Sequence, residues 1–445
     1  MRKVVSVLVS VFSIAVSACP AHAGATTTAV RDEVPAVSVV RKEAEQGNAQ
    51  AQLRLGMMYR EGYGVTRDDA MAVAWLRKAA DQGWPAAQFW VGMMFLEGRG
   101  VAQDDSEAVA WFRKGADQGH GLSECSLGAM YMEGRGVARD DAVAVSWFRK
   151  GAEQGDAGSQ LDLGVMYMEG RGVARDDGLA VGWFRKAAGQ GHAAAEQNLG
   201  VMYRDGRGVG RDDVEAVAWF RKSAEQGDDW GQLNLGVMYM EGRGVARDDA
   251  SAVSWFRKAA AQGSAEAENN LGVMYRDARG VGRDDVEAFA WFRKAAEQGY
   301  DEGQLNFGGM YMEGRGVAQD DAVAVSWFRK AAAQGRALAE HNLGVMYRDG
   351  RGVGHDDVEA VAWFRKAAER GEARAQYNLA MMYMAGQGVA RDDAAAVAWF
   401  RKAADQGLAL AQSNLGVMYM EGRGVPRDYE QAIIWYRCGC EADER

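Results

Sequence analysis

The chain has 445 residues, of which 48% are hydrophobic, and it carries a formal net charge of −10 at pH 7. Nucleic acid and anionic membrane surfaces repel such an acidic chain, so neither is expected as a partner. A single hydrophobic core seldom serves a chain of this length, which favours several domains or a structure that repeats along the sequence.

Residues 1–23 predict an export signal, with two basic residues ahead of an apolar run from Val4 to Val16 and a cleavage site at Ala21-His22-Ala23. The run is too short to anchor the chain stably in a bilayer. Alternatively, the exported chain begins at a lipidated Cys19, because Val16-Ser17-Ala18-Cys19 is similar to the lipobox of bacterial lipoproteins. Both readings predict an exported protein, periplasmic or secreted, which contacts a membrane only if Cys19 is lipidated. Cleavage after residue 23 removes two positive charges and moves the net charge from −10 to −12.

The segments around the central region are short. Residues 24–35 predict a flexible leader, and residues 36–47 match the second half of the repeat described next. This half repeat carries Glu43 where complete copies have alanine, as expected of an end cap with one face in water. Residues 441–445 form a polar tail.

A repeat of 36 residues occupies residues 48–440. Its tryptophan recurs 36 residues apart from Trp75 to Trp435, so eleven copies follow one another without insertion or deletion. A period of this size is typical of solenoids, in which each copy buries its apolar faces against its neighbours. Copies 1 to 11 begin at Asn48, Trp84, His120, Asp156, His192, Asp228, Ser264, Tyr300, Arg336, Glu372 and Leu408.

Each copy predicts two helices, as residues 228–263 illustrate. The first, helix A, is expected over residues 232–241, where apolar residues recur at helical spacing. Gly242 is placed as its left-handed cap, and Asp248 is placed as the N-cap of the second helix, helix B, which Gly263 closes. Ten copies keep a glycine at the position of Gly236, although glycine inside a helix costs about 1 kcal/mol relative to alanine. This indicates that a neighbouring helix needs the space.

The string A-x-x-x-L-G-x-M-Y-x-x-G-x-G-V-x-x-D, followed by A-x-x-W-F-R-K-A-A-x-Q-G, resembles the Sel-one-like repeat, a relative of the tetratricopeptide repeat. The resemblance covers about nine-tenths of the chain. It implies an all-α fold, a right-handed superhelical α/α solenoid of eleven helix-turn-helix repeats after an N-terminal half repeat. It also implies use as an adaptor or scaffold for protein complexes, without naming a partner.

Two helix A positions seven residues apart, and therefore on one face, change together through six consecutive copies. Apolar pairs alternate with polar, cationic pairs, and we expect them to line a concave partner-binding face with cationic bands between strips of leucine and methionine. Duplication of a 72-residue double repeat followed by drift is the alternative explanation. The pairs are Leu161 with Met168, Gln197 with Arg204, Leu233 with Met240, Asn269 with Arg276, Leu305 with Met312, and His341 with Arg348.

An asparagine recurs beside these positions. In a groove such a row would hold the backbone of an extended peptide, while in the stack each amide would bond to groups of neighbouring copies. The row consists of Asn198, Asn234, Asn270, Asn306, Asn342, Asn378 and Asn414.

The motifs give no signature of catalytic, cofactor-binding or metal-ligating residues. The G-R-G-V turns lack the preceding strand and the Lys-Ser/Thr ending of a phosphate-binding loop. Paired aspartates such as Asp212 and Asp213 stand at the start of helix B, which favours helix capping over calcium binding. The five histidines include no H-E-x-x-H motif.

Some secreted members of the Sel-one-like repeat family have a disulfide in nearly every repeat and are described as β-lactamases or penicillin binders. This chain has no regular cysteine pair and no S-x-x-K or G-x-S-x-G motif. We therefore expect no enzyme and no cofactor, but a scaffold of the bacterial cell envelope that binds a protein or peptide through the concave face of its A helices. The alternatives are a secreted cell-wall or β-lactam hydrolase and an exported effector adaptor that acts on host proteins.

Overall fold

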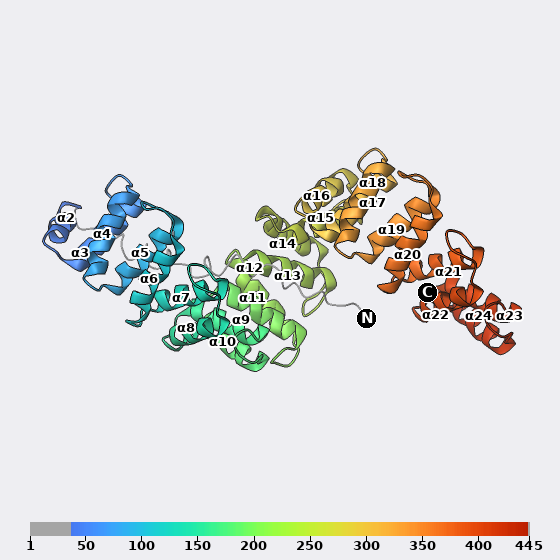
Figure 1. Ribbon diagram of the computed structural model, residues 1–445, viewed down its shortest axis with the longest axis horizontal. Coiled ribbons are helices and arrows are strands. Elements are labelled where there is room, and N and C mark those ends of the chain that lie inside the picture. Colours follow the sequence, from blue (N-terminus) through green and yellow to red (C-terminus); the bar gives the residue numbers. More distant parts are fainter. Residues whose placement is uncertain (1–36, 444–445) are drawn as a thin grey trace. The chain divides into compact units, whose positions relative to one another are not determined.

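The computed structural model describes residues 37–443, and side chains as far as residue 437. Regular structure in this range consists of 23 α-helices (Figure 1). The predicted all-α solenoid is confirmed, and α2 (Val37–Glu45) is the helix of the predicted half repeat. The predicted signal and leader, including Cys19, lie outside the described residues.

Every copy contributes one helix A and one helix B. The A helices are α3 (Ala49–Glu61), α5 (Pro85–Glu97), α7 (Gly121–Glu133), α9 (Ala157–Glu169), α11 (Ala193–Asp205), α13 (Asp229–Glu241), α15 (Ala265–Arg276), α17 (Asp301–Glu313), α19 (Ala337–Asp349), α21 (Ala373–Ala385) and α23 (Ala409–Glu421). The B helices are α4 (Asp69–Asp81), α6 (Asp105–Ala116), α8 (Asp141–Glu153), α10 (Asp177–Gly189), α12 (Asp213–Glu225), α14 (Asp249–Ala261), α16 (Asp285–Glu297), α18 (Asp321–Ala333), α20 (Asp357–Glu369), α22 (Asp393–Asp405) and α24 (Tyr429–Asp443).

The chain forms two compact units that divide within copy 6. The N-terminal unit runs to Gly231 and includes Arg243–Val245, and the C-terminal unit comprises Gln232–Gly242 and the chain from Ala246 on. Within the N-terminal unit each helix from α2 to α12 contacts the next one in the chain, and the same holds from α14 to α24 in the C-terminal unit. Each unit is therefore a stack in which sequence neighbours are spatial neighbours.

The predicted start of helix A in copy 6 is too late, because α13 begins three residues before Gln232. Asp228 provides the reason, since its Oδ2 accepts a hydrogen bond from the backbone N–H of Gly231 at 2.6 Å and so caps the helix. The predicted cap of helix B is confirmed: Asp248 accepts from the N–H groups of two residues in the first turn of α14. Gly242 has a φ of +68°, as the predicted left-handed cap requires.

The recurring glycine of helix A makes room for an aromatic ring of its own copy. In copies 2 to 9, a Cβ on this glycine would lie 2.5–2.8 Å from a ring carbon of the phenylalanine in the following helix B. In copy 4 the contact joins Gly164 to the fully buried Phe184. The predicted close approach of a neighbouring helix is confirmed, and the aromatic side chain is what requires it.

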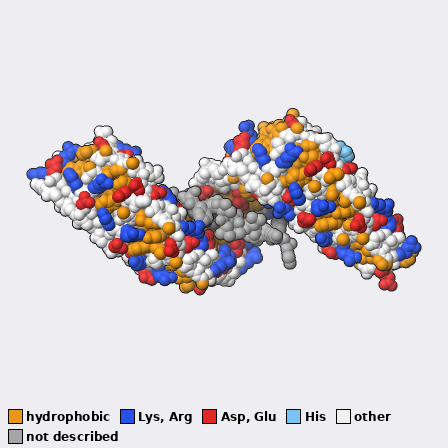
Figure 2. Space-filling model, in the orientation of Figure 1, with side chains coloured by type: hydrophobic (Ala, Val, Ile, Leu, Met, Phe, Trp, Pro, Cys, Tyr) orange, Lys and Arg blue, Asp and Glu red, His pale blue; other side chains and the backbone are white. Residues whose placement is uncertain are grey.

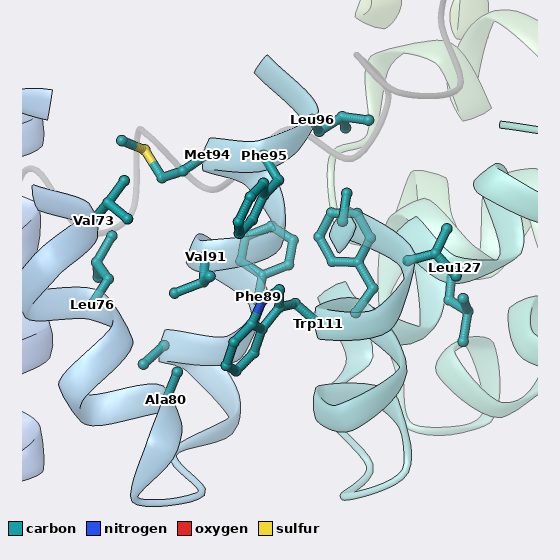
Figure 3. Close-up of a cluster of buried hydrophobic side chains, with 14 of the residues drawn as sticks. Val73, Leu76, Ala80, Phe89, Val91, Met94, Phe95, Leu96, Trp111 and Leu127 are labelled. Atoms are coloured by element: carbon teal, nitrogen blue, oxygen red, sulfur yellow. The ribbon is translucent and has the colours of Figure 1, made fainter. Parts of the chain in front are cut away.

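The local cores join successive helices. One cluster combines Leu161 of α9, Phe184 of α10 and Leu199 of α11. Figure 3 shows the same arrangement nearer the N-terminus, where Leu76 of α4, Phe89 of α5 and Trp111 of α6 lie in one buried cluster. Because helix A of one copy completes the core of the preceding copy, no copy has a core of its own.

The tryptophan of helix B lies at the edge of this core. In copies 1 to 10 a lysine three residues later places its ammonium group 3.5–4.0 Å from the centre of the indole ring. A cation over the face of an indole is attracted by the negative charge of the ring face. The tryptophan series therefore contributes to packing on one side and supports a charged surface on the other.

Candidate functional site

The paired positions of helix A differ in their access to solvent. Most of the first members are buried, with exposed fractions of 3–9% at Leu161, Leu233, Asn269, Leu305 and His341, while Gln197 is half-buried. The second members are all half-buried. Contact with a partner would therefore fall mainly on the second members, which we call the A-helix face: Met168, Arg204, Met240, Arg276, Met312 and Arg348.

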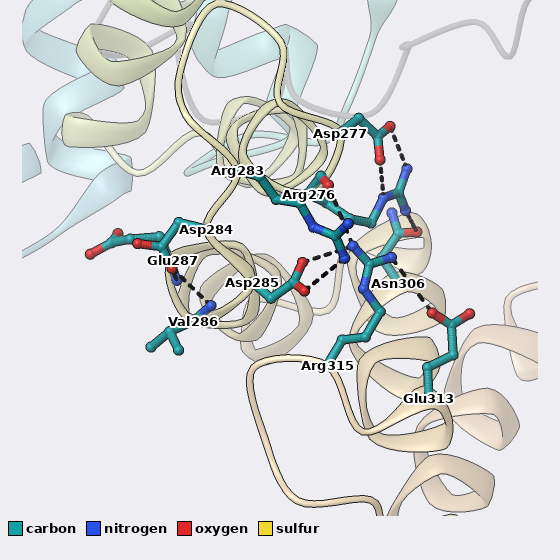
Figure 4. Close-up of polar contacts among 10 residues, drawn as sticks. All are labelled: Arg276, Asp277, Arg283, Asp284, Asp285, Val286, Glu287, Asn306, Glu313 and Arg315. Carbon is teal, nitrogen blue, oxygen red and sulfur yellow. Dashed lines mark hydrogen bonds and ion pairs between the residues drawn. The ribbon is translucent and has the colours of Figure 1, made fainter.

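The three arginines of the A-helix face are ion-paired. Their Nε atoms lie 2.7–2.8 Å from an oxygen of the aspartate that follows each of them, namely Asp205, Asp277 and Asp349. Figure 4 shows the pair of Arg276 and Asp277, in which the hydrogen bond from the guanidinium lowers the pKa of the carboxyl. The expected cationic bands are thus bands of paired opposite charges, although 23–35% of each arginine side chain remains exposed.

Two asparagines of the predicted row connect one copy to the next in the C-terminal unit. Asn306 donates from Nδ2 to Oδ1 of Asn269 at 2.8 Å and accepts from Arg276 at 3.4 Å. Asn378 makes the equivalent pair of bonds with the ring Nε2 of His341 at 3.0 Å and with Arg348 at 3.4 Å. The interpretation that these amides join stacked copies is confirmed here.

The hydrogen bond with Asn378 also determines which ring nitrogen of His341 carries the proton. Because Nδ2 of an amide only donates, Nε2 of His341 must accept and the proton must be on Nδ1. Burial lowers the pKa of His341, which keeps the ring neutral and able to accept this bond.

The second aspartate of each pair at the start of helix B joins two copies, a role that the sequence analysis missed. In nine places it binds the arginine of the next G-R-G turn, 30 residues later, at 2.7–3.2 Å. Figure 4 shows Asp285 between Arg283 of its own copy and Arg315 of the next, while Asp284 caps the helix. The signal was available, because this arginine recurs with the period of the repeat.

The turn containing this arginine also contacts the preceding copy through its backbone. Its second glycine, such as Gly172, lies against the first residue of the preceding helix B, Asp141. The recurring turns are therefore structural connections between copies.

The family model described as Sel1 repeat matches eleven stretches of the chain, from residues 49–84 to residues 409–444. The chain belongs to the Sel1 repeat family. Its sequence is 41% identical to c5321, a protective antigen present in uropathogenic Escherichia coli strains that displays an SLR fold; the match covers 93% of this chain and 90% of that chain, with a TM-score of 0.76.

A Sel1 repeat protein from Oxalobacter formigenes is also similar, at 33% identity over 72% of this chain and 92% of that chain, with a TM-score of 0.52. No curated protein matches this Sel1 repeat chain. Proteins with Sel1 repeats generally mediate interactions between proteins.

Two histidines of this Sel1-repeat protein line an open cleft between successive inter-copy turns. The cleft has a volume of about 390 Å³, and Asp156 also lines it. Burial lowers the pKa of His120, whose ring Nδ1 lies 2.9 Å from Oγ of Ser123. Within the part of the chain that the structure describes, no group of three or more histidine, cysteine or acidic side chains is arranged to hold a metal ion.

The surface of this Sel1-repeat protein is mixed in charge. Figure 2 shows basic and acidic side chains beside one another over the visible face of each unit. None of the helices in the described range is both long enough and apolar enough to cross a membrane.

Proposed function

We propose that this Sel1-repeat protein is a non-catalytic scaffold or adaptor of the bacterial cell envelope, which binds a protein or peptide partner through the A-helix face. One observation carries the proposal. The position that reaches solvent alternates between methionine and arginine, while the core phenylalanine, the capping aspartate and the turn glycines repeat. Because the fold accepts both methionine and arginine at this position, selection for a partner can act on the choice between them.

The chemistry of the A-helix face suits a protein partner with mixed polarity. Methionine is unbranched and adapts to the shape of an apolar side chain. Part of each arginine side chain is exposed, and the neighbouring aspartate holds its guanidinium in place. A guanidinium fixed in this way loses less side-chain freedom when a partner carboxylate binds it.

The proposal is tested by replacing the arginines of the A-helix face with the methionine that other copies have at the same position. Arg204, Arg276 and Arg348 are replaced together by methionine, the residue of the alternate copies, and the mature protein is used to capture binding proteins from an envelope extract for mass spectrometry. We expect the specific captured protein to be lost or strongly reduced, because the arginine contacts are removed while the helices keep a native side chain.

The matched control replaces Arg221, Arg293 and Arg365 by methionine. These arginines are exposed on the B helices of the same three copies, so the change in charge is the same. Equal capture by both triple variants would contradict binding at the A-helix face.

We also propose that the protein is exported, as the predicted signal implies. The relative from Escherichia coli is a protective antigen, which supports a location outside the cytoplasmic membrane. Fractionation of cells expressing the full chain and its Cys19→Ser variant separates the two forms. Loss of membrane association in the variant supports a lipoprotein, and an unchanged soluble envelope fraction supports cleavage after Ala23.

A further inference from the structure

The fourth residue of every A helix is buried, with an exposed fraction of 2–7%, although it is always glutamine or glutamate. Glutamine occurs in seven copies and glutamate in copies 3, 5, 7 and 9. The glutamines are Gln52, Gln88, Gln160, Gln232, Gln304, Gln376 and Gln412, and the glutamates are Glu124, Glu196, Glu268 and Glu340.

The glutamines show what this position does. In six copies the side-chain Nε2 donates to the backbone carbonyl oxygen eight residues earlier, in the preceding helix B, at 3.0–3.5 Å. In six copies Oε1 accepts from a second glutamine 30 residues later, just after the following helix B, at 2.7–3.0 Å. The amide thus uses both its donor and its acceptor to join three successive helices. We call this connection, made by the fourth residue of helix A, a joint.

Three of the glutamates keep the acceptor half of this pattern. Gln154 donates to Glu124 at 2.9 and 3.1 Å, Gln226 to Glu196 at 2.6 Å, and Gln298 to Glu268 at 2.7 Å. The donor half depends on protonation, because an ionised carboxylate has no hydrogen to offer a carbonyl oxygen. A neutral carboxylic acid has one, and in that form it is the closest match to the glutamine of the other copies.

The surroundings of the three glutamates also favour the neutral form. Burial is the main cause that raises the pKa of each, because a charge loses its hydration there. Two groups act in the opposite direction and lower the pKa. The first is the hydrogen bond from the glutamine 30 residues later, and the second, with a smaller effect, is one lysine on the following helix B: Lys150, Lys222 and Lys294. Asp156 and Asp228, before the next helix A, raise the pKa of Glu124 and Glu196 further.

Glu340 differs in its partner. Arg370 occupies the place of the second glutamine, and its Nε lies 3.1–3.2 Å from both carboxylate oxygens. A guanidinium has no acceptor and carries a permanent charge, so this contact is an ion pair and not a hydrogen bond from an amide. The chain therefore has two kinds of joint with a glutamate: three in which a glutamine donates to it and one in which an arginine pairs with it.

We propose that Glu124, Glu196 and Glu268 are carboxylic acids in the folded stack and that they make the joints at copies 3, 5 and 7 sensitive to pH. The proposal is independent of the partner-binding function. Because the folded state holds these protons more tightly than the unfolded state, stability is highest below the unfolded-state pKa of about 4.3. It falls as the pH rises from there through the raised pKa of the folded state.

The test measures urea unfolding of the mature full chain by circular dichroism between pH 4.5 and 8. The triple variant E124Q/E196Q/E268Q installs the residue of the other copies, so it is expected to fold. We expect its urea midpoint to exceed that of the unsubstituted protein at pH 8, with a gain that shrinks steadily toward pH 4.5.

Two controls separate this effect from a general change of charge. E153Q/E225Q/E369Q alters three exposed glutamates at the ends of B helices and changes the net charge equally. E340Q breaks the ion pair with Arg370, so it should lower the midpoint at pH 8. The proposal is overturned if the first triple gives the same gain at every pH, if it gives no gain, or if the exposed triple reproduces it.

The reverse substitution gives a second readout. Gln160→Glu places a new carboxyl between Ala152 and Gln190, the partners of the present amide. It should make the urea midpoint fall more steeply with pH than in the unsubstituted protein. An unchanged slope would contradict the proposal.

Discussion

Alanine in place of the second turn glycine should break the contact between two copies. Gly172 in copy 4 has a φ of +65°, which costs an alanine roughly 1–2 kcal/mol. A Cβ at this position would also overlap the carbonyl oxygen of Asp141 and would lie 2.8 Å from the amide nitrogen of Ala142. These are backbone atoms at the start of α8, so they cannot move aside as the end of a side chain can.

Overpacking of this kind adds about 1–3 kcal/mol, so Gly172→Ala should cost about 3 kcal/mol in total. The matched control is Gly170→Ala, two residues earlier, where φ is +70° and the nearest atom to a Cβ is Cβ of Arg175 at 3.1 Å. This variant should cost only the backbone strain of roughly 1–2 kcal/mol. Copy 7 supports the smaller cost at Gly170, because it has Ala278 at the equivalent position with a φ of +56°.

The assay is urea unfolding of the full chain together with hydrogen exchange of the backbone amides in the first turns of α8. Gly172→Ala should lower the midpoint more than Gly170→Ala, and it alone should accelerate exchange in α8. Equal losses in the two variants would refute the idea that the turn is held by contact with the preceding copy.

Two further substitutions probe contacts between copies. Asp162 takes the place of an asparagine in the row, and burial, followed by the nearby carboxylates of Asp156 and Glu133, raises its pKa to about 8. Asp162→Asn should therefore stabilise the protein at pH 8, and the gain should shrink as the pH falls toward the unfolded-state pKa of about 3.9, as pH-dependent thermal melting will show. Arg315→Ala should cost about 1 kcal/mol more than Arg283→Ala in urea unfolding, although both bind Asp285, because the Arg315 side chain is 26% exposed and that of Arg283 is 60% exposed.

The helices and their caps were predictable from the sequence because each depends on nearby residues, and the close approach at the helix A glycine was predictable because that glycine recurs in ten copies. A glycine that ends a helix, such as Gly242, and an aspartate that begins one, such as Asp248, act within three or four residues of themselves. The start of helix A was placed too late because its cap at Asp228 is aspartate, histidine, asparagine or another residue in different copies.

The candidate site was less predictable, because solvent access depends on how successive copies stack. The spacing of seven residues correctly places His341 and Arg348 on one face of α19, yet His341 is buried and Arg348 is not. A periodic pattern gives the direction of a side chain but not the position of the next helix. The pairing of Arg276 with Asp277 was also missed, although the two residues are adjacent in the sequence. The partner-binding role of these positions stays a prediction.

Alternate copies differ both at the buried fourth residue of helix A and at the position of the A-helix face. In α11, α15 and α19 a buried glutamate and an arginine of the A-helix face occur in the same helix, eight residues apart, as Glu196 and Arg204 illustrate. Duplication of a 72-residue double repeat accounts for the coincidence, and it also has a physical consequence. A proton gained or lost at Glu268 alters the support of the helix that carries Arg276, so binding at the A-helix face and stability of the joints should both depend on pH in copies 5 and 7.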